Sequence, residues 1–468
     1  MRARLEHLLV PVVVALDYAA LSWFPRFATM TGHPEAAFRA GTVAFIVVNA
    51  GVLLLGHRGA PAFMARWPAL GTAPGRPAIS AASARWCVFA ALAVAGLGYR
   101  LSAIARTPLD PQQADMLPLI VAAGRTLLAG GNPYHRANPF LTPALSSSAS
   151  RSDLGFPDVP PWLPALWLPY VPATWVGIDL RVVGLLAALS TAVLLGVARW
   201  ARPARPDRVA GEPLTAWLRL ASAGGLWLAP AAVWFGAIGH TQTYWFYLTG
   251  LLWALSRRWW GRAGVGLGLC VMSRHTVLPL LPILALYAWR GLAPRERRTM
   301  AIGAAAVIVV VALPFGGDGL WQFTIGTPIW YMKFGDLGWN GPRWWVTHTF
   351  GLSTFLYPVG LSRAIPWVGA ALVAAVYGLA YRRVRDLPSC VRFLALVLLA
   401  VQVSVPTPFR YEFFPILLVL SALPLLAHAR PDGAAAMPAR SQRTAFASSH
   451  RRLARSVSAS ASSGTPKS

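Results

Sequence analysis

Long apolar runs alternate with short clusters of arginine from one end of this sequence to the other. The runs are about 15 to 25 residues long, and about 20 helical residues cross the core of a bilayer about 30 Å thick. Only 12% of the 468 residues are charged, whereas soluble globular proteins carry about 25%. The sequence therefore predicts an all-α, polytopic membrane helix bundle of about 10–13 transmembrane helices.

The net charge of the chain is +26 and comes almost entirely from arginine. A basic balance of this size can indicate nucleic-acid binding. Here, however, the arginines lie in the short segments between apolar runs, which is the pattern of cytoplasmic loops in membrane proteins. We therefore expect a multi-pass protein of the plasma membrane that contacts membrane lipids and binds no nucleic acid.

Ten apolar runs are long enough, or nearly long enough, to cross the membrane as single helices. They cover residues 8–24, 41–56, 86–105, 183–199, 215–238, 241–256, 300–315, 364–382, 391–404 and 411–428. A further apolar stretch, 263–289, is interrupted by Ser273, Arg274 and His275. Two shorter pieces, 160–176 and 349–361, are rich in proline or glycine and are expected to be short spans or re-entrant segments.

Placing every arginine cluster on one side of the membrane gives an expected topology. Both termini then lie in the cytoplasm, and the loops 106–158 and 316–348 are external. This arrangement requires that 160–176 and 349–361 do not cross completely. It also requires that 263–289 forms a hairpin of two half-helices with Arg274 and His275 at its tip.

The same pattern divides the chain into three parts. Residues 1–85 form an N-terminal two-helix membrane segment with a cytoplasmic loop, and residues 86–430 form the membrane core. Residues 431–468 are rich in serine, alanine and arginine. They lack the large apolar side chains that a folded core needs, so we expect a disordered basic cytoplasmic tail.

The external loop 106–158 carries the most informative motif. Its first part reads RTPLDPQQADMLPLIVAAGRTLLAGGNPYHRANPF. Asp115 precedes apolar residues at helical spacing, which predicts an amphipathic helix on the outer membrane surface, and Gly130-Gly131 ends it. A carboxylate at that interface could act as a general base on an acceptor hydroxyl. Alternatively, Asp115 is only the helix N-cap.

The run from Asp115 through Gly130-Gly131-Asn132-Pro133-Tyr134 to Pro160-Pro161-Trp162 resembles the first external loop of the GT-C superfamily of membrane glycosyltransferases. It is most similar to the bacterial alpha-1,2-mannosyltransferases that use polyprenyl-phosphate-mannose. The resemblance implies a GT-C core over residues 86–430, with Asp115 as catalytic base and Asp110 as the competing choice. Val159 departs from the family pattern, which carries tyrosine before the two prolines.

The resemblance also implies the reaction. An inverting hexosyltransferase would move a hexose, mannose above others, from a polyprenyl-phosphate-sugar donor to a lipid or glycan acceptor at the extracytoplasmic face. Tyr134 would then contact substrate. Gly239-His240-Thr241-Gln242 is similar to a Gly-Gln turn of the family, so His240 and Gln242 are candidate substrate contacts, or merely a polar helix connection.

Three basic residues are candidates for holding the donor phosphate: Arg274, His275 and Arg410. An arginine at membrane depth is costly and tends to be functional, and its guanidinium can hold a phosphate with paired hydrogen bonds. The alternative for Arg274 is a structural cation bonded to carbonyls freed at a helix break. Arg410 could instead pair with Glu412 or anchor the membrane interface.

The loop 316–348 is rich in tryptophan, and Trp344 and Trp345 could form a platform for a sugar ring. Alternatively, these side chains belong to an interfacial aromatic belt. Asp17, in the first apolar run, is either a hydrogen-bonding partner inside the bundle or a functional acid. No clustered carboxylates indicate a metal site, and no motif indicates a cofactor.

Two other function classes remain open from the sequence. A multi-pass transporter or lipid flippase would fit the bundle, although we find no internal repeat of the kind common in transporters. A polyprenyl-lipid glycan polymerase or ligase would also carry large external loops. These alternatives differ from the glycosyltransferase in whether a monophosphate-linked sugar is consumed.

Overall fold

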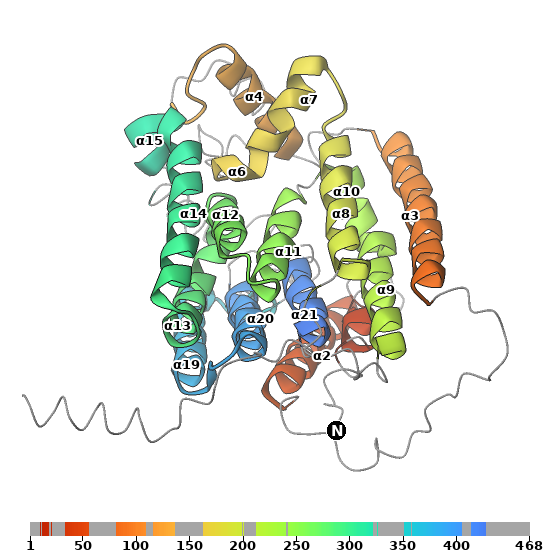
Figure 1. Ribbon diagram of the computed structural model, residues 1–468, viewed down its shortest axis with the longest axis vertical. Helices are drawn as coiled ribbons and strands as arrows, with labels where there is room; N and C mark the ends of the chain where they lie inside the picture. The colour runs from red at the N-terminus through yellow and green to blue at the C-terminus, as the bar shows by residue number, and fades with distance from the viewer. Residues whose placement is uncertain are drawn as a thin grey trace, which may run out of the picture.

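The computed structural model describes a helical protein (Figure 1). The residues it describes are 10, 12–17, 20, 33–55, 81–108, 116–135, 162–198, 200, 212–239, 242–321, 325, 351–356, 358–404 and 413–426. No strand occurs among them. This bears out the all-α prediction over the described part of the chain.

The helices before the break in the sequence 263–289 are, in chain order, α2 Pro34–Leu55, α3 Ala81–Arg106, α4 Met116–Leu128, α6 Pro164–Trp167, η3 Leu168–Tyr170, α7 Val171–Val176, α8 Arg181–Gly196, α9 Glu212–Leu228, α10 Pro230–Ala237, α11 Thr243–Ser256 and α12 Trp260–Val271. Those after it are η5 His275–Leu280, α13 Leu281–Gly291, α14 Pro294–Ala312, η6 Leu313–Phe315, α15 Gly316–Trp321, α18 Ser353–Leu356, η8 Ser362–Ala364, α19 Ile365–Arg383, α20 Leu387–Ser404 and α21 Phe414–Leu426.

The elements are arranged with two distinct ends. The short helices α4, α6 and α7 lie together at the upper end in Figure 1, whereas α13 and α19 lie near the lower end of α14. Between the ends, α3 packs on α9, α9 on α8, α8 on α11, α11 on α12, and α12 on α14. One end is therefore formed by the short helices α4, α6 and α7, and the other end includes α13 and α19.

Among the described residues, four helices are long and apolar enough to cross a membrane, namely Trp86–Arg106, Pro294–Trp321, Ile365–Arg383 and Leu387–Ser404. The bent pair of α9 and α10 would make a fifth. These helices confirm the membrane-protein class by length and composition. The larger number of about 10–13 spans stays a prediction, because several other apolar helices are shorter.

The outer helices expose large apolar side chains that water would not favour. Val94 of α3 is 71% exposed, Val310 of α14 is 70% exposed, and Trp367 of α19 is 78% exposed. By contrast, most residues of α20 and all residues of α21 are buried. A helix that is apolar all round and buried belongs to the centre of the bundle, so α20 and α21 form the core, and the outer helices carry exposed apolar faces that suit a lipid surrounding.

Helices α12 and α14 pack through glycine. A Cβ atom added at Gly264 would overlap the Met300 carbonyl oxygen, and one added at Gly268 would lie 2.8 Å from the Ala304 carbonyl oxygen. A Cβ at Gly303 would lie 2.7 Å from the Gly261 carbonyl oxygen. Small residues let membrane helices approach backbone to backbone. The matched positions also show that both helices start at the same end of the pair.

The predicted interruption of 263–289 is confirmed. Helix α12 ends at Val271, a turn follows, and η5 begins at His275. The segment 160–176 is also broken, into α6, η3 and α7, each with proline in its first two positions. No piece is longer than six residues, or about 9 Å at 1.5 Å per residue. None of them can cross a bilayer alone.

The span predicted over 215–238 is not one straight helix. Helix α9 ends at Leu228, α10 starts at Pro230, and the two are bent by 43°. Proline has no backbone N–H, and its ring clashes with the carbonyl four residues earlier. Pro230 therefore cannot bond the Leu226 carbonyl, and the helix breaks there.

The amphipathic helix after Asp115 is present as α4, and Gly130 follows it with φ of 77°. This left-handed conformation suits glycine and ends the helix. The expected surroundings of α4 differ, however. Eight of its thirteen residues are buried, and it packs against α7 and η3. Its apolar face therefore covers protein, where we had expected the membrane surface.

Candidate functional site

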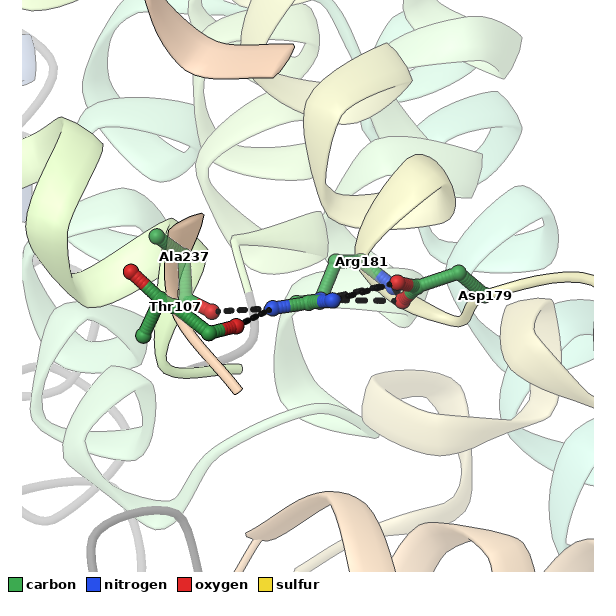
Figure 2. Close-up of polar contacts among 4 residues, drawn as sticks. All are labelled: Thr107, Asp179, Arg181 and Ala237. Atoms are coloured by element: carbon green, nitrogen blue, oxygen red, sulfur yellow. Dashed lines mark hydrogen bonds and ion pairs between the residues drawn. The ribbon is translucent and has the colours of Figure 1, made fainter. Parts of the chain in front are cut away.

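Arg181, the first residue of α8, joins three separate elements (Figure 2). Its Nη1 donates to the Thr107 carbonyl oxygen at 2.8 Å and to the Ala237 carbonyl oxygen at 2.9 Å. Its Nε and Nη2 donate to the Asp179 carboxylate at 2.6 to 3.0 Å. The Arg181 side chain is only 8% exposed. One guanidinium thus holds the ends of α3 and α10 against the start of α8.

Asp179 orients this guanidinium. Its Oδ1 also accepts a hydrogen bond from the Arg181 backbone N–H at 2.9 Å, which fixes the turn into α8. Partial burial acts to raise the pKa of the Asp179 carboxyl, but the hydrogen bonds and charge of Arg181 outweigh it and hold the pKa below its usual value. The pair is therefore ionised at neutral pH.

The clamp made by Arg181 and Asp179 stands beside two of the predicted motifs. Thr107 lies just before Asp110 and Asp115, and Ala237 lies just before Gly239-His240-Thr241-Gln242. Asp110, Asp115 and His240 themselves lie outside the described residues. The structure therefore places the starts of both segments at one point, and the positions of the three side chains stay untested.

Helix α6 connects the remaining described candidates. The Trp167 indole N–H donates to the Tyr134 hydroxyl at 2.8 Å, and that hydroxyl donates to the Trp162 carbonyl oxygen at 2.7 Å. Tyr134 is 3% exposed, and burial raises the pKa of its phenol well above the usual value, although the hydrogen bond from Trp167 acts to lower it. Tyr134 is thus a neutral, internally bonded side chain that anchors the turn after α4 to α6.

The other side of α6 contacts the break in 263–289 and the start of α11. The Ala165 N–H donates to the Met272 carbonyl oxygen at 2.8 Å. The Thr243 hydroxyl donates to the Leu166 carbonyl oxygen at 3.1 Å, and the Tyr247 hydroxyl donates to the Ala165 carbonyl oxygen at 3.1 Å. Four residues of α6 therefore lie between the Tyr134 turn, the α12 break and α11.

Arg274 lies in that break and is 8% exposed. Its guanidinium carbon lies 5.0 Å from the centroid of the Tyr244 ring, and its Nη1 donates to the Tyr244 hydroxyl at 3.5 Å. Such a distance is at the long limit for a hydrogen bond. His275, at the first position of η5, is half-buried. Arginine keeps its charge when buried, so the break carries a positive charge beside α6 and α11.

Gln242 is engaged within the bundle by Arg100. Its Nε2 donates to the Ala232 carbonyl oxygen at 2.9 Å, and its Oε1 accepts from Arg100 Nη1 at 3.4 Å. Arg100 also donates to the carbonyl oxygens of Trp227 at 2.9 Å and Leu226 at 3.3 Å. These carbonyls stand at the proline break between α9 and α10. Gln242 therefore helps to hold the broken helix together.

The other candidates lie outside the described residues. They are Asp110, Asp115, His240, Trp344, Trp345 and Arg410. The predicted basic tail 431–468 also lies outside the described residues. Among the described residues no group of three or more histidine, cysteine, aspartate or glutamate side chains could hold a metal ion. The hydrogen bond expected as one of two roles for Asp17 is present, donated by Asn49 Nδ2 at 3.0 Å.

Sequence reasoning missed three side chains of this region: Arg100, Asp179 and Arg181. A signal for Arg100 was available, because it interrupts the apolar run 86–105 and charge at membrane depth needs a partner. Asp179 and Arg181 gave a weaker signal, an acid and a base two residues apart at a helix start. The other partners of Arg181 are backbone carbonyls 56 and 74 residues away in the sequence, which no local pattern could indicate.

Comparison of the chain with protein-family models, with curated proteins and with solved structures gave no match.

Proposed function

We propose that the chain is a GT-C-type membrane glycosyltransferase that moves a hexose, mannose foremost, from a polyprenyl-phosphate-sugar donor to a lipid or glycan acceptor. The observation that supports this most is the Arg181 clamp. It fixes the residues just before the segment with Asp110 and Asp115 and those just before His240, so both segments start from one rigid point. A reaction that needs an acid or base near a substrate-binding turn requires that the two segments are held in a fixed position relative to each other.

Arg274 supplies the second element of the proposal. The donor leaves its phosphate behind, and the two negative charges of a phosphate monoester need a cation close to the membrane. A guanidinium buried beside α6 and held over the Tyr244 ring is suited to that role, because arginine binds phosphate oxygens through paired N–H groups. His275 and Arg410 are the proposed additional contacts.

In the proposed reaction, Asp115, or Asp110 in its place, accepts the proton of the acceptor hydroxyl. The acceptor oxygen then forms a bond to the sugar C1 as the bond from C1 to the phosphate oxygen breaks. The electron pair of that bond leaves with the polyprenyl phosphate, next to Arg274. Attack opposite the leaving group inverts the anomeric centre.

The test is a transfer assay with the purified full chain in lipid nanodiscs, radiolabelled polyprenyl-phosphate-mannose and a panel of lipid and glycan acceptors. We expect Asp115→Asn, or failing that Asp110→Asn, to lower transfer by about 100-fold or more, since general base catalysis contributes about that much. Asp386→Asn is the matched control at the opposite end of the molecule. Undiminished transfer in both Asp115→Asn and Asp110→Asn would refute the proposed base.

A second candidate function is a transporter or lipid flippase. The observation that favours it is the pair of broken helices, α9 with α10 and α12 with η5, each with a buried arginine at its break. Discontinuous helices of this kind often form substrate sites in transporters. Counterflow of a labelled sugar lipid across proteoliposomes, without covalent change, would favour transport over transfer.

A further inference from the structure

Arginines stand at five helix ends, of which those of α13, α14 and α19 lie at the end of the molecule opposite α4, α6 and α7 (Figure 1). They follow α11, begin α12, end α13, begin α14 and end α19. We refer to them as the basic end: Arg257, Arg258, Arg262, Arg290, Arg295, Arg297, Arg298, Arg382, Arg383 and Arg385. This group is separate from the candidate site described above.

Specific contacts bring these helix ends together. The Trp260 indole N–H donates to Glu296 Oε1 at 2.9 Å, which joins the start of α12 to the start of α14. Arg290 Nη1 donates to the carbonyl oxygens of Tyr381 at 2.6 Å and Val384 at 3.2 Å, which joins α13 to α19. The basic end is therefore one continuous region built from four helices and the turn after α11.

The two carboxylates in this region are committed to helix starts. Glu296 accepts from the Ala293 backbone N–H at 2.8 Å as well as from Trp260, and Asp386 accepts from the Ser389 backbone N–H at 2.9 Å. Within the described part of the chain neither carboxylate forms an ion pair with an arginine of the basic end. The ten arginines of the basic end are thus not neutralised by these two carboxylates.

Aromatic rings hold several of the guanidinium groups in place. Arg262 lies over the Trp259 ring at 4.5 Å and Arg257 at 5.4 Å, while Arg297 lies over the Trp289 ring at 5.1 Å. Trp289 is 75% exposed. Tryptophan is enriched where membrane meets water, and a cation over a ring keeps its N–H donors for other partners. Arginines held over such rings are suited to a position at headgroup depth.

Arg258 provides an independent observation. Its φ is +57°, the only positive value among the described residues other than glycine. It follows the end of α11, where the Trp259 N–H donates to the Ala254 carbonyl oxygen at 2.9 Å. Glycine is the usual residue at this position of a helix end, and other side chains there carry backbone strain. An exposed arginine kept in spite of that strain points to a use for its charge.

From these observations we infer that the basic end binds the phosphate headgroup of an anionic phospholipid in the adjacent leaflet. The ligand is held by arginines from the turn after α11 and from the starts of α12 and α14, with the acyl chains against the exposed apolar surface of the bundle. This site is independent of the proposed sugar transfer. It accounts for the uncompensated charge, the exposed tryptophan and the strained Arg258 together.

The test is lipid titration of the purified full chain in detergent, with bound lipids counted by native mass spectrometry. The probes are phosphatidylglycerol and phosphatidylcholine with identical acyl chains. We expect phosphatidylglycerol to bind the wild-type chain at least about tenfold more tightly, since each arginine near a lipid headgroup contributes about 1 kcal/mol. Arg258→Gly should weaken phosphatidylglycerol binding by about fivefold and leave the melting temperature unchanged or higher, because it removes both the charge and the strain.

Arg106→Gln is the control, because Arg106 is an exposed arginine in the last turn of α3 at the other end. It should leave lipid binding unchanged. The inference is overturned if both lipids bind alike, or if Arg106→Gln weakens binding as much as Arg258→Gly does. It is equally overturned if inorganic phosphate, added as a competitor, displaces phosphatidylglycerol completely, since the site would then be one for a soluble anion. The double substitution Arg262→Gln with Arg297→Gln leaves the backbone of the α11 turn unchanged, and it should also weaken phosphatidylglycerol binding.

Discussion

The bundle contains two broken helices, and a buried arginine stands at each break. At the break between α9 and α10, Arg100 comes from a different helix and bonds the carbonyl oxygens of Leu226 and Trp227. At the break between α12 and η5, Arg274 belongs to the break itself and lies over the Tyr244 ring. The first arginine replaces hydrogen bonds that proline removed, whereas the contact shown for the second is with a neighbouring aromatic side chain.

The sequence left two interpretations open for an arginine at membrane depth, namely a structural cation at a helix break and a phosphate-binding group. Backbone carbonyls freed at a break cost free energy unless they find donors. Arg100 supplies those donors for α9, so its role is structural. For Arg274, binding an external phosphate remains our proposal. If it is right, substitutions of Arg100 should act mainly on the free energy of unfolding, whereas substitutions of Arg274 should act mainly on sugar transfer.

The largest effect is expected from Arg100→Met. The substitution keeps much of the side-chain volume but leaves the Leu226 and Trp227 carbonyls and the Gln242 amide without their cation. We expect the free energy of unfolding to fall by about 3 kcal/mol, the cost of stranding buried polar groups. Denaturant unfolding in detergent measures this loss, with Arg106→Gln on the same helix as control. If Arg100→Met unfolds like the wild-type chain, Arg100 does not have the structural role that sets it apart from Arg274.

Next in size is the effect of Arg274→Gln on sugar transfer. We expect transfer to fall by about 100-fold while the free energy of unfolding changes far less than in Arg100→Met, since a lost charge contact to the leaving phosphate has about this effect on rate. Arg274→Lys should also be impaired, because a point charge cannot form the paired hydrogen bonds. If Arg274→Gln unfolds as readily as Arg100→Met and folded molecules retain full transfer, Arg274 is structural as well.

A third prediction concerns the origin of the first break. Pro230→Ala restores an N–H that can bond the Leu226 carbonyl, so Arg100 should then matter less. In a double-mutant cycle with Arg100→Met, we expect a coupling free energy of about 1 kcal/mol. Additive effects of the two substitutions would show that the carbonyl at the break is not what Arg100 stabilises.

The smallest effect is expected from Tyr244→Phe. It removes only the hydroxyl that Arg274 reaches at 3.5 Å, so the free energy of unfolding should change by about 0.5 kcal/mol or less. Tyr244→Leu also removes the ring under the guanidinium and should cost about 1 kcal/mol more. A larger loss in Tyr244→Phe than in Tyr244→Leu would contradict the stacked arrangement.

The two breaks also show what could be predicted from this sequence. The break near Arg274 was predicted because polar residues interrupt an apolar run and because the arginine clusters on both sides belong to one face. The break at Pro230 was not predicted, because no charged residue of the run 215–238 lies near the proline and proline is tolerated within membrane helices when freed groups find partners. That partner, Arg100, lies 126 residues earlier than Leu226.

The candidate site was predicted less completely than the fold. The positions of Tyr134, Gln242 and Arg274 near one end follow from topology, and all three lie beside α6, α10 or α11 as described above. Their hydrogen-bond partners do not follow from it, since Tyr134 and Gln242 bond to groups inside the bundle. Sequence patterns indicate which residues share a face, but the direction of each side chain depends on packing between distant helices.

The glycine contacts of α12 with α14 limit how this protein can move. Where two backbones touch without side chains between them, one helix cannot slide past the other, since a shift of one residue would drive a side chain into a carbonyl oxygen. The two helices are therefore expected to travel together. A rearrangement around Arg274 would then move α12 and α14 as one unit relative to η5, across the turn at Met272, Ser273 and Arg274.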